Sequence, residues 1–519
     1  MSATSRGARI TLLMAVVAAG LYWVAHHAEV SLADGLRSVR QAGRIDRGDL
    51  AGGLWRSIDH PMHPLAVAAV HRVIGGGDAP YAWQTAAQFA SVLTLVLAAV
   101  PLYLLARELF DDDATASLAV LLVLLGPVAC AAAVNVLSET TFLLFWTWGL
   151  WASARFLRDG SFAWLVPAVG FGALAYLTRP EGVLIHAALV ATMLLLTLSR
   201  GTRILWPRWC AAVAVLVLGP VVLVGPYVAV KGGVGTKPAV ARLIGTEPEA
   251  PPEALERERP PTPGQSTAAR YADATGRVFK AVRGAVTWPL LPLSAAGIYS
   301  VFRGSGRGRA RAWVFLGAIG GFAAAGLVRL HATGGYCTVR HALIPGVILT
   351  LFAARGLVWV LRDLPIDGRW LGLGEGRVRP GPLVWAVALV VLLALPVYQA
   401  RTPYGTSFGP YRQAGLWLAG RPEADGALVD LTDWTLFFSG KRGDGFAGVL
   451  DAVDRPGTRY VVLRKAHMNG HLHYNDVVRR ALAGRAPGAR FPEQPAPRQL
   501  QVAVYDLAAP AAAQGTRLR

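Results

Sequence analysis

Apolar runs long enough to cross a lipid bilayer recur along the first 400 residues, and this feature limits the fold more than any other. The runs hold 16 to 23 residues, close to the length that a helix needs to cross the hydrocarbon core. Lipid offers no partner to a free backbone amide, so each run must be a helix. The runs cover residues 9–25, 83–105, 116–134, 141–156, 163–178, 183–198, 211–230, 286–301, 313–328, 342–358 and 383–398. The sequence therefore predicts a polytopic α-helical membrane protein with about eleven transmembrane helices.

The first run is predicted to be a retained helix and not a cleaved signal peptide. It follows a short basic stretch with Arg6 and Arg9, and no convincing small-x-small cleavage site lies beyond it. It is also longer than most signal-peptide cores.

A net charge of +19 raises the question of nucleic-acid binding, but the placement of the charge argues against it. The arginines sit mostly in short loops between apolar runs, where membrane proteins carry their topological signal. With a cytoplasmic N-terminus, the loops on that side hold Arg107, Arg155, Arg158, Arg200, Arg203, Arg208, Arg303, Arg307, Arg309, Arg311, Arg362, Arg369, Arg377 and Arg379. We therefore expect a multi-pass protein of the inner (plasma) membrane, with a cytoplasmic N-terminus, an extracytoplasmic C-terminus and no nucleic-acid partner.

The chain divides into two predicted domains. Residues 1–400 form the transmembrane domain, with long outer loops at 28–82 and 231–285. Residues 401–519 are expected to form a small extracytoplasmic α/β domain. Its apolar patterns predict helices near 411–418 and 475–482 and strands at 427–431, 460–463 and 501–505.

Polar residues gather on the predicted outer side of the membrane. They are Asp34, Asp59, His60, His63, Glu139, Arg179, Glu181, Tyr336, Arg340 and His341. Ionisable groups at membrane depth are costly unless they are paired or face a cavity, which makes each one a site candidate. Taken singly, each could equally be a solvated or ion-paired loop residue; their shared side of the membrane favours a site.

Asp34 lies a few residues beyond the first run, in a segment whose spacing of Leu36, Val39 and Ile45 suits a helix at the membrane interface. A carboxylate held there can act as a general base toward a hydroxyl. The alternative is that Asp34 caps this helix through its side-chain oxygen.

Arg179 and Arg340 are suited to bind phosphate, because a guanidinium makes bidentate, charge-assisted contacts and stays ionised. If they pair with Glu139 or Glu181 instead, they are structural. His60 and His63 lie in "HPMHP", where rigid prolines either display the imidazoles or merely form a turn. Two histidines do not make a metal site, and the three cysteines have no metal-type spacing.

Several segments resemble the polyprenyl-phosphate-sugar glycosyltransferases of the C superfamily (GT-C), relatives of the protein O-mannosyltransferases and of the lipid A aminoarabinose transferase. The segments are "ADGLRSVRQAG", "HPMHPLA", "VLSETTFLLFW", "LAYLTRPEGVLI" and "RHALIPGVILTLFAARGL", in the expected order over residues 1–360. Where the family often shows an acidic pair after the first helix, this chain has Asp34 followed by Gly35, so Asp34 would be the sole base there.

The resemblance implies transfer of a sugar from a polyprenyl-phosphate carrier to a lipid, glycan or protein acceptor at the outer membrane face, with inversion and without a nucleotide. Asp34 would be the catalytic base. The implied substrate-binding residues are Arg340, His341, Arg179, Glu139, His60, His63 and Tyr336. The resemblance also allows a divalent metal near the phosphate, although the sequence shows no dedicated ligand set.

Two other classes of protein remain open at this stage. A secondary transporter or flippase would also have many helices with polar residues, but it tends to show a repeat between halves and charges at the midplane. A receptor that binds through its α/β domain would need fewer spans than this chain has. Polymerase or ligase chemistry on a lipid-linked glycan also remains open.

Overall fold

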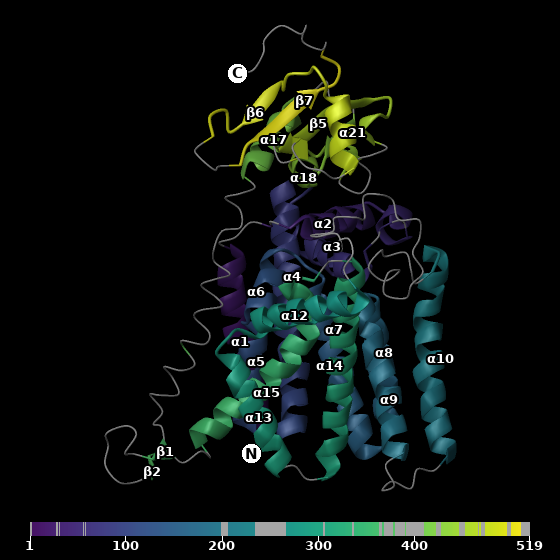
Figure 1. Cartoon of the computed structure of the whole chain (residues 1–519), viewed down its shortest axis with the longest axis vertical. Helices are drawn as coiled ribbons and strands as arrows, with labels where there is room; N and C mark the ends of the chain where they lie inside the picture. The colour runs from purple at the N-terminus through teal and green to yellow at the C-terminus, as the bar shows by residue number, and fades with distance from the viewer. Residues whose placement is uncertain are drawn as a thin grey trace.

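The computed structural model describes residues 3–26, 30, 32–55, 57, 59–198, 206–233, 266–304, 307–334, 337–362, 366–367, 377–378, 390, 409–421, 427–445, 452–464, 467–468, 473–495 and 500–509. Helices run lengthwise in a bundle, and the C-terminal α/β domain covers one end of it (Figure 1). The N-terminus lies toward the opposite end, while α2 (Ala33–Asp46) and α3 (Met62–Ile74) lie between the bundle and the α/β domain. The architecture confirms the predicted fold class.

The other helices of the bundle follow in chain order. The first group is α1 (Ala3–His26), η1 (Ala51–Trp55), α4 (Pro80–Phe110), α5 (Asp113–Leu124), α6 (Pro127–Val134), α7 (Glu139–Asp159) and α8 (Phe162–Tyr176). The second group is η2 (Pro180–Val183), α9 (Leu184–Leu198), α10 (Trp206–Lys231), α12 (Thr267–Val286), α13 (Leu290–Gly304), α14 (Arg307–Gly334), η5 (Val339–Ala342) and α15 (Leu343–Arg362).

Six helical segments of the described chain are long and apolar enough to cross a membrane, or up to eight if each of two bent pairs counts as one span. The six cover Ser5–His26, Pro80–Phe110, Pro180–Leu198, Pro207–Lys231, Arg309–Thr333 and Val339–Arg362. Helix α8 has 15 residues, and the run predicted at 383–398 lies outside the described residues, apart from residue 390. The predicted number of about eleven spans therefore stays a prediction.

Two breaks bend the helical path of the bundle. Helices α5 and α6 meet at 46°, where Gly126 precedes Pro127 at the start of α6. Helices α12 and α13 meet at 91°, so α12 lies across the bundle (Figure 1). Helix α12 occupies the end of the segment expected as a loop at 231–285. Its apolar positions, Ala274, Val278, Ala281 and Ala285, have helical spacing.

The main apolar core lies inside the bundle and is built mainly from α1, α4, α5, α7, α14 and α15. Small residues allow some of these helices to approach closely. A Cβ at Gly297 of α13 would lie 1.9 Å from the carbonyl oxygen of Phe352, and one at Gly356 of α15 would lie 1.9 Å from that of Leu293. Glycine at both positions lets α13 and α15 pack backbone against backbone, as small residues do in membrane helix pairs.

The C-terminal domain contains a five-stranded sheet in the order β4-β3-β5-β7-β6. Strands β3, β4 and β5 are parallel, while β7 pairs antiparallel with β5 and with β6. Its elements are α17 (Gly409–Ala419), β3 (Ala427–Asp430), α18 (Trp434–Ser439), β4 (Gly443–Asp444), β5 (Thr458–Arg464), α21 (His473–Ala481), β6 (Ala489–Phe491) and β7 (Val502–Asp506). The predicted strands and helices of this domain are confirmed. A separate short ribbon, β1 (Ile366–Asp367) with β2 (Arg377–Val378), precedes it.

The two faces of the sheet have different neighbours because side chains alternate along each strand. Leu428 and Val462 share an apolar cluster with α17 and α18, and this cluster continues into Leu36 and Val39 of α2. The opposite face packs on α21. Tyr81, at the start of α4, adds an aromatic contact with Phe438 at 5.7 Å between ring centroids. The α/β domain is therefore packed directly against helix α2.

Candidate active site

A pocket of about 240 Å³ lies at the end of the bundle that carries the α/β domain. Its wall combines α2, the start of α7, the η2 turn, the end of α14 and the η5 turn. Six of the eight predicted site residues line it: Asp34, His60, Glu139, Arg179, Arg340 and His341. His63 is absent from this lining, and Tyr336 lies outside the described residues. Segments far apart in the sequence thus meet at one polar pocket.

Asp34 is presented by the first turn of α2 and is about one-third exposed. The predicted alternative, that Asp34 caps this helix, is wrong, because Leu32 is the N-cap residue and no side chain caps the helix. The Asp34 carboxylate forms ion pairs with Arg340 and, at 2.7 Å, with Arg37. Burial acts to raise the pKa of Asp34, but the two guanidinium groups outweigh burial and hold this pKa well below its usual range.

Arg37 is the site residue that the sequence prediction missed. Its guanidinium also contacts the Asp59 carboxylate at 3.1 Å, so it bridges two acidic side chains of the pocket. The available signal was the spacing of Asp34 and Arg37, because residues three apart lie on the same face of a helix. Asp59 was noticed in the sequence as part of the outer polar cluster, and the structure places it in the pocket lining.

Arg179 is held by two carboxylates. It precedes the η2 turn, and its guanidinium lies 2.6 Å from Glu139, at the start of α7, and 2.7 Å from Glu181. Glu139 is almost fully buried, so this ion pair joins α7 to η2 inside the bundle. The structural alternative predicted for Arg179 is confirmed in this respect. Arg340, in the η5 turn, contacts Asp34 and is more exposed than Arg179.

The three histidines have different surroundings. His60 lines the pocket and meets the ring of Tyr176 edge to face at 5.4 Å. His63 is fully buried in α3, where Nδ1 lies 2.9 Å from the Thr141 hydroxyl and Nε2 lies 3.1 Å from the Val136 carbonyl oxygen. Burial lowers the pKa of His63 to about 4, so its ring is neutral at neutral pH. His63 therefore ties α3 to α7.

His341 lines the pocket beside Arg340 and also shapes the η5 turn. Its Nδ1 accepts a hydrogen bond from the backbone N–H of Thr338, at 3.2 Å. The Thr338 side chain in turn caps the first residues of the turn, which completes a capping box. This reciprocal cap fixes the turn that presents Arg340 to the pocket.

The ionisable lining has four carboxylates, Asp34, Asp59, Glu139 and Glu181, against three guanidinium groups, Arg37, Arg179 and Arg340. The negative and positive charges of these side chains therefore nearly cancel. Within the described chain, no three His, Cys, Asp or Glu side chains gather closely enough to hold a metal ion. The mechanism proposed for this site assigns no step to a metal ion.

Comparison with known proteins agrees with this fold. Residues 59–224 match the family model for dolichyl-phosphate-mannose-protein mannosyltransferase. No curated protein matches the chain in sequence.

The solved structures that share the fold include an oligosaccharyltransferase and ArnT. The archaeal oligosaccharyltransferase AglB from Archaeoglobus fulgidus, in complex with an inhibitory peptide and a dolichol-phosphate, has a TM-score of 0.58 at 12% identity, covering 90% of this chain and 70% of AglB. ArnT from Cupriavidus metallidurans, bound to undecaprenyl phosphate, has a TM-score of 0.59 at 15% identity, covering 99% of this chain and 100% of ArnT. The resemblance found in the sequence is confirmed by the family model and by the fold.

Proposed function

We propose that this protein is an integral membrane glycosyltransferase that moves a sugar from a polyprenyl-phosphate carrier to a hydroxyl-bearing acceptor. The observation that carries the proposal is the ion pair between Asp34 and Arg340 in a pocket at one end of the helical bundle. It places a carboxylate able to accept a proton beside a cation able to bind phosphate. The fold shared with AglB and ArnT, whose structures contain dolichol-phosphate and undecaprenyl phosphate, supports this donor class.

Arg340 is the first phosphate ligand in this proposal. Its guanidinium is about one-quarter exposed in the pocket, and its planar fork matches two phosphate oxygens. Arg179 lies deeper and is already held by Glu139 and Glu181. We assign Arg179 a contribution to the electrostatic field at the phosphate, and Glu139 the task of orienting Arg179.

Asp34 is the general base. The acceptor oxygen attacks the anomeric carbon, its proton passes to Asp34, and the bond from the anomeric carbon to the phosphate oxygen breaks with its electron pair going to the phosphate. Attack opposite the leaving group inverts the anomeric configuration. The guanidinium of Arg340 stabilises the charge that develops on the leaving phosphate.

The resting ion pairs couple donor binding to the strength of this base. While Arg340 and Arg37 both contact Asp34, its lowered pKa makes it a weak base. A donor phosphate that engages Arg340 competes for the same guanidinium and so raises the pKa of Asp34. The pocket of about 240 Å³ is smaller than the roughly 300–1,000 Å³ typical of ligand sites, so the donor must also separate these groups.

Other residues of the site position the substrates. His60 and His341 line the pocket and are proposed to contact the sugar or the acceptor. His63 is buried and bonded to neighbouring elements, so it acts through the position of α3. Tyr336, whose surroundings lie outside the described residues, keeps its predicted substrate-binding role.

The acceptor is a lipid, glycan or protein, and the reaction is placed at the extracytoplasmic membrane face. Arg107, Arg155, Arg158 and Arg309 meet at the end of the bundle away from the candidate site. By the positive-inside rule, that end is cytoplasmic. The candidate site and the α/β domain would then lie on the extracytoplasmic side of the membrane, the side that the sequence predicts.

A secondary transporter or flippase is the main rival. It would require charged groups near the midplane and broken helices related by a repeat. Here the charged groups of the pocket lie at helix starts and turns, such as Glu139 at the first residue of α7. This placement favours chemistry at the membrane surface.

The test compares wild type with Asp34→Asn, which keeps the side-chain size and removes the base. Each protein is purified and incubated with radiolabelled polyprenyl-phosphate sugars and a panel of lipid, glycan and peptide acceptors. Asp46→Asn, at the other end of α2, is the matched control because Asp46 is absent from the pocket lining.

We expect wild type and Asp46→Asn to transfer sugar, and Asp34→Asn to be slower by about 10² to 10⁴-fold, the usual range for loss of a general base. Full activity of a folded Asp34→Asn protein would exclude Asp34 as the general base. Transport of donor without transfer by wild type would favour the flippase instead.

A further inference from the structure

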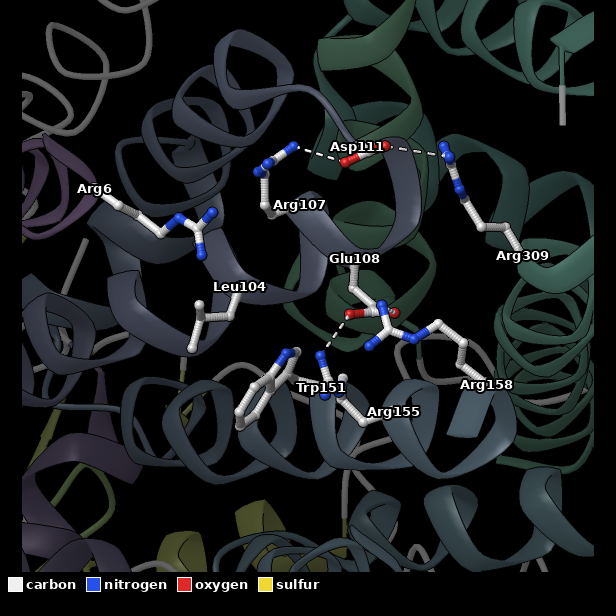
Figure 2. Close-up of a pocket in the computed structure, with 9 residues that line it drawn as sticks. All are labelled: Arg6, Leu104, Arg107, Glu108, Asp111, Trp151, Arg155, Arg158 and Arg309. Carbon is white, nitrogen blue, oxygen red and sulfur yellow. Dashed lines mark hydrogen bonds and ion pairs between the residues drawn. The ribbon is translucent and has the colours of Figure 1, made fainter. Parts of the chain in front are cut away.

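A second pocket, of about 610 Å³, lies at the end of the bundle opposite the candidate active site. Five arginines line it: Arg6 of α1, Arg107 of α4, Arg155 and Arg158 of α7, and Arg309 of α14. Figure 2 shows these side chains arranged around a common space. The volume falls within the roughly 300–1,000 Å³ typical of ligand sites.

The carboxylates in and beside this pocket do not neutralise all of its arginines. Asp111 contacts Arg107 at 2.9 Å and Arg309 at 3.3 Å (Figure 2). Glu108 contacts Arg158 at 2.5 Å and Arg155 at 3.6 Å. Two further carboxylates just outside the lining, Asp113 and Asp159, contact Arg107 and the α7 arginines.

The excess positive charge of the pocket is concentrated on Arg6. Within the described chain, no carboxylate lies within ion-pairing distance of Arg6, although its side chain borders the pocket (Figure 2). Arg309 is 40% exposed, and its contact with Asp111 is longer than the 2.9 Å contact of Arg107. The unbalanced positive charge of these guanidinium groups favours binding of an anion in the pocket.

The depth of the pocket favours a lipid. Helix α7 begins at Glu139 in the candidate site and reaches Arg155 beside this pocket, which at 1.5 Å per residue is about 24 Å, close to the thickness of the hydrocarbon core. Leu104 and Trp151 give the pocket an apolar wall, and tryptophan favours the membrane interface. A ligand with an anionic phosphate and apolar chains matches both kinds of surface.

We propose that this pocket binds the phosphate group of an anionic membrane phospholipid, with Arg6 as its principal ligand. The proposal is independent of the glycosyltransferase assignment, because it concerns the other end of the molecule and needs no sugar transfer.

The test measures lipid binding to the full chain by native mass spectrometry, with phosphatidylglycerol and phosphatidylcholine added separately to delipidated protein. The variants are Arg6→Gln and Arg309→Gln. Arg303→Gln is the matched control because Arg303 lies near the same end, at the last turn of α13, outside the pocket lining.

We expect wild type and Arg303→Gln to prefer phosphatidylglycerol. Arg6→Gln should bind it about tenfold more weakly, as expected for loss of a charge-assisted hydrogen bond. Arg309→Gln should be weakened less, because its side chain lies across the pocket from Arg6 (Figure 2). Equal binding of the two lipids by wild type, or equal weakening in all three variants, would overturn the proposal. A competition experiment with inorganic phosphate distinguishes a lipid phosphate from free phosphate as the ligand. Displacement of the lipid by an equal concentration of inorganic phosphate would assign the pocket to the free ion and overturn the lipid assignment.

Discussion

Arg40 of α2 and Asp433 of the α/β domain form an ion pair of 2.6 Å, although 393 residues separate them in the sequence. The Asp433 side chain is almost fully buried, and Arg40 lies on the helix that presents Asp34 and Arg37 to the candidate site. The α/β domain therefore contributes directly to the position of the proposed base.

We predict that Arg40→Gln lowers the stability of the protein by about 2 kcal/mol, because it leaves the buried Asp433 carboxylate without its charged partner. Sugar transfer should fall as well, since α2 loses its tie to the α/β domain. Arg455→Gln is the control, because its pair with Asp444 is far more exposed and should change stability by about 0.5 kcal/mol or less. Thermal unfolding and transfer rates measure both effects; equal losses in the two variants would contradict the prediction.

Gly35→Ala should lower the rate of sugar transfer by displacing helix α2, although it removes no reactive group. A Cβ at Gly35 would lie 1.9 Å from the Asn135 carbonyl oxygen, so α2 must shift, and Asp34 with it. At Gly43 of the same helix the nearest atom to a new Cβ belongs to the Arg47 side chain at 3.5 Å, so Gly43→Ala should be tolerated. Transfer assays on both variants, after a check of folding by size-exclusion chromatography, decide this; an active Gly35→Ala protein would show that α2 is not held closely.

Arg340→Gln should weaken donor binding because it removes the proposed phosphate ligand. We expect the KM for the polyprenyl-phosphate sugar to rise by about tenfold or more, with Arg340→Lys recovering part of the loss through its charge but not the bidentate geometry. Arg72→Gln, on α3 and outside the pocket lining, serves as the control. A KM unchanged in Arg340→Gln would exclude Arg340 as a donor ligand.

The pH dependence of kcat/KM should reveal the ion pairs of Asp34. This parameter reports the free enzyme, in which the lowered pKa keeps Asp34 ionised, so its protonation should cause no loss of activity between about pH 7 and pH 5. In Arg37→Gln one guanidinium partner is gone, so the pKa of Asp34 rises and the acid limb moves to higher pH.

Arg44→Gln is the control for this profile. Arg44 is an exposed arginine of the same helix and is absent from the pocket lining, so its loss should leave the acid limb in place. An acid limb at the same pH in Arg37→Gln and wild type would mean that Asp34 is not the group that limits the reaction at low pH.

His63→Ala should act on stability and not on donor recognition. The change empties a fully buried position and removes contacts with Thr141 and with the Val136 carbonyl, so we expect a loss of about 3 kcal/mol. His26→Ala, at an exposed helix end, should cost far less. Thermal unfolding measures the loss, and the KM of the folded enzyme for its donor should not change; a large rise in KM with normal stability would assign His63 to substrate binding.

The arrangement of the site was only partly predictable. Asp34, Arg179 and Arg340 attract attention in the sequence because charged residues are rare beside apolar runs. The pairing of Arg179 with Glu139 and Glu181 was one of the alternatives that the sequence offered, whereas the ion pair of Arg340 with Asp34 was not predicted. Ion pairs between residues hundreds of positions apart depend on where the helices pack, and the lengths of apolar runs carry no such information.

The sequence by itself determined that the chain spans a membrane as helices and ends in an α/β domain, since hydrophobic length and period follow from local composition. Tertiary structure decided which polar residues meet. It added Arg37 to the site, placed Asp59 in the pocket lining beside it, and buried His63 in the packing of α3. It also paired Arg40 with Asp433. The physical reason is that a bilayer selects helices residue by residue, whereas a pocket exists only where several of those helices end beside one another.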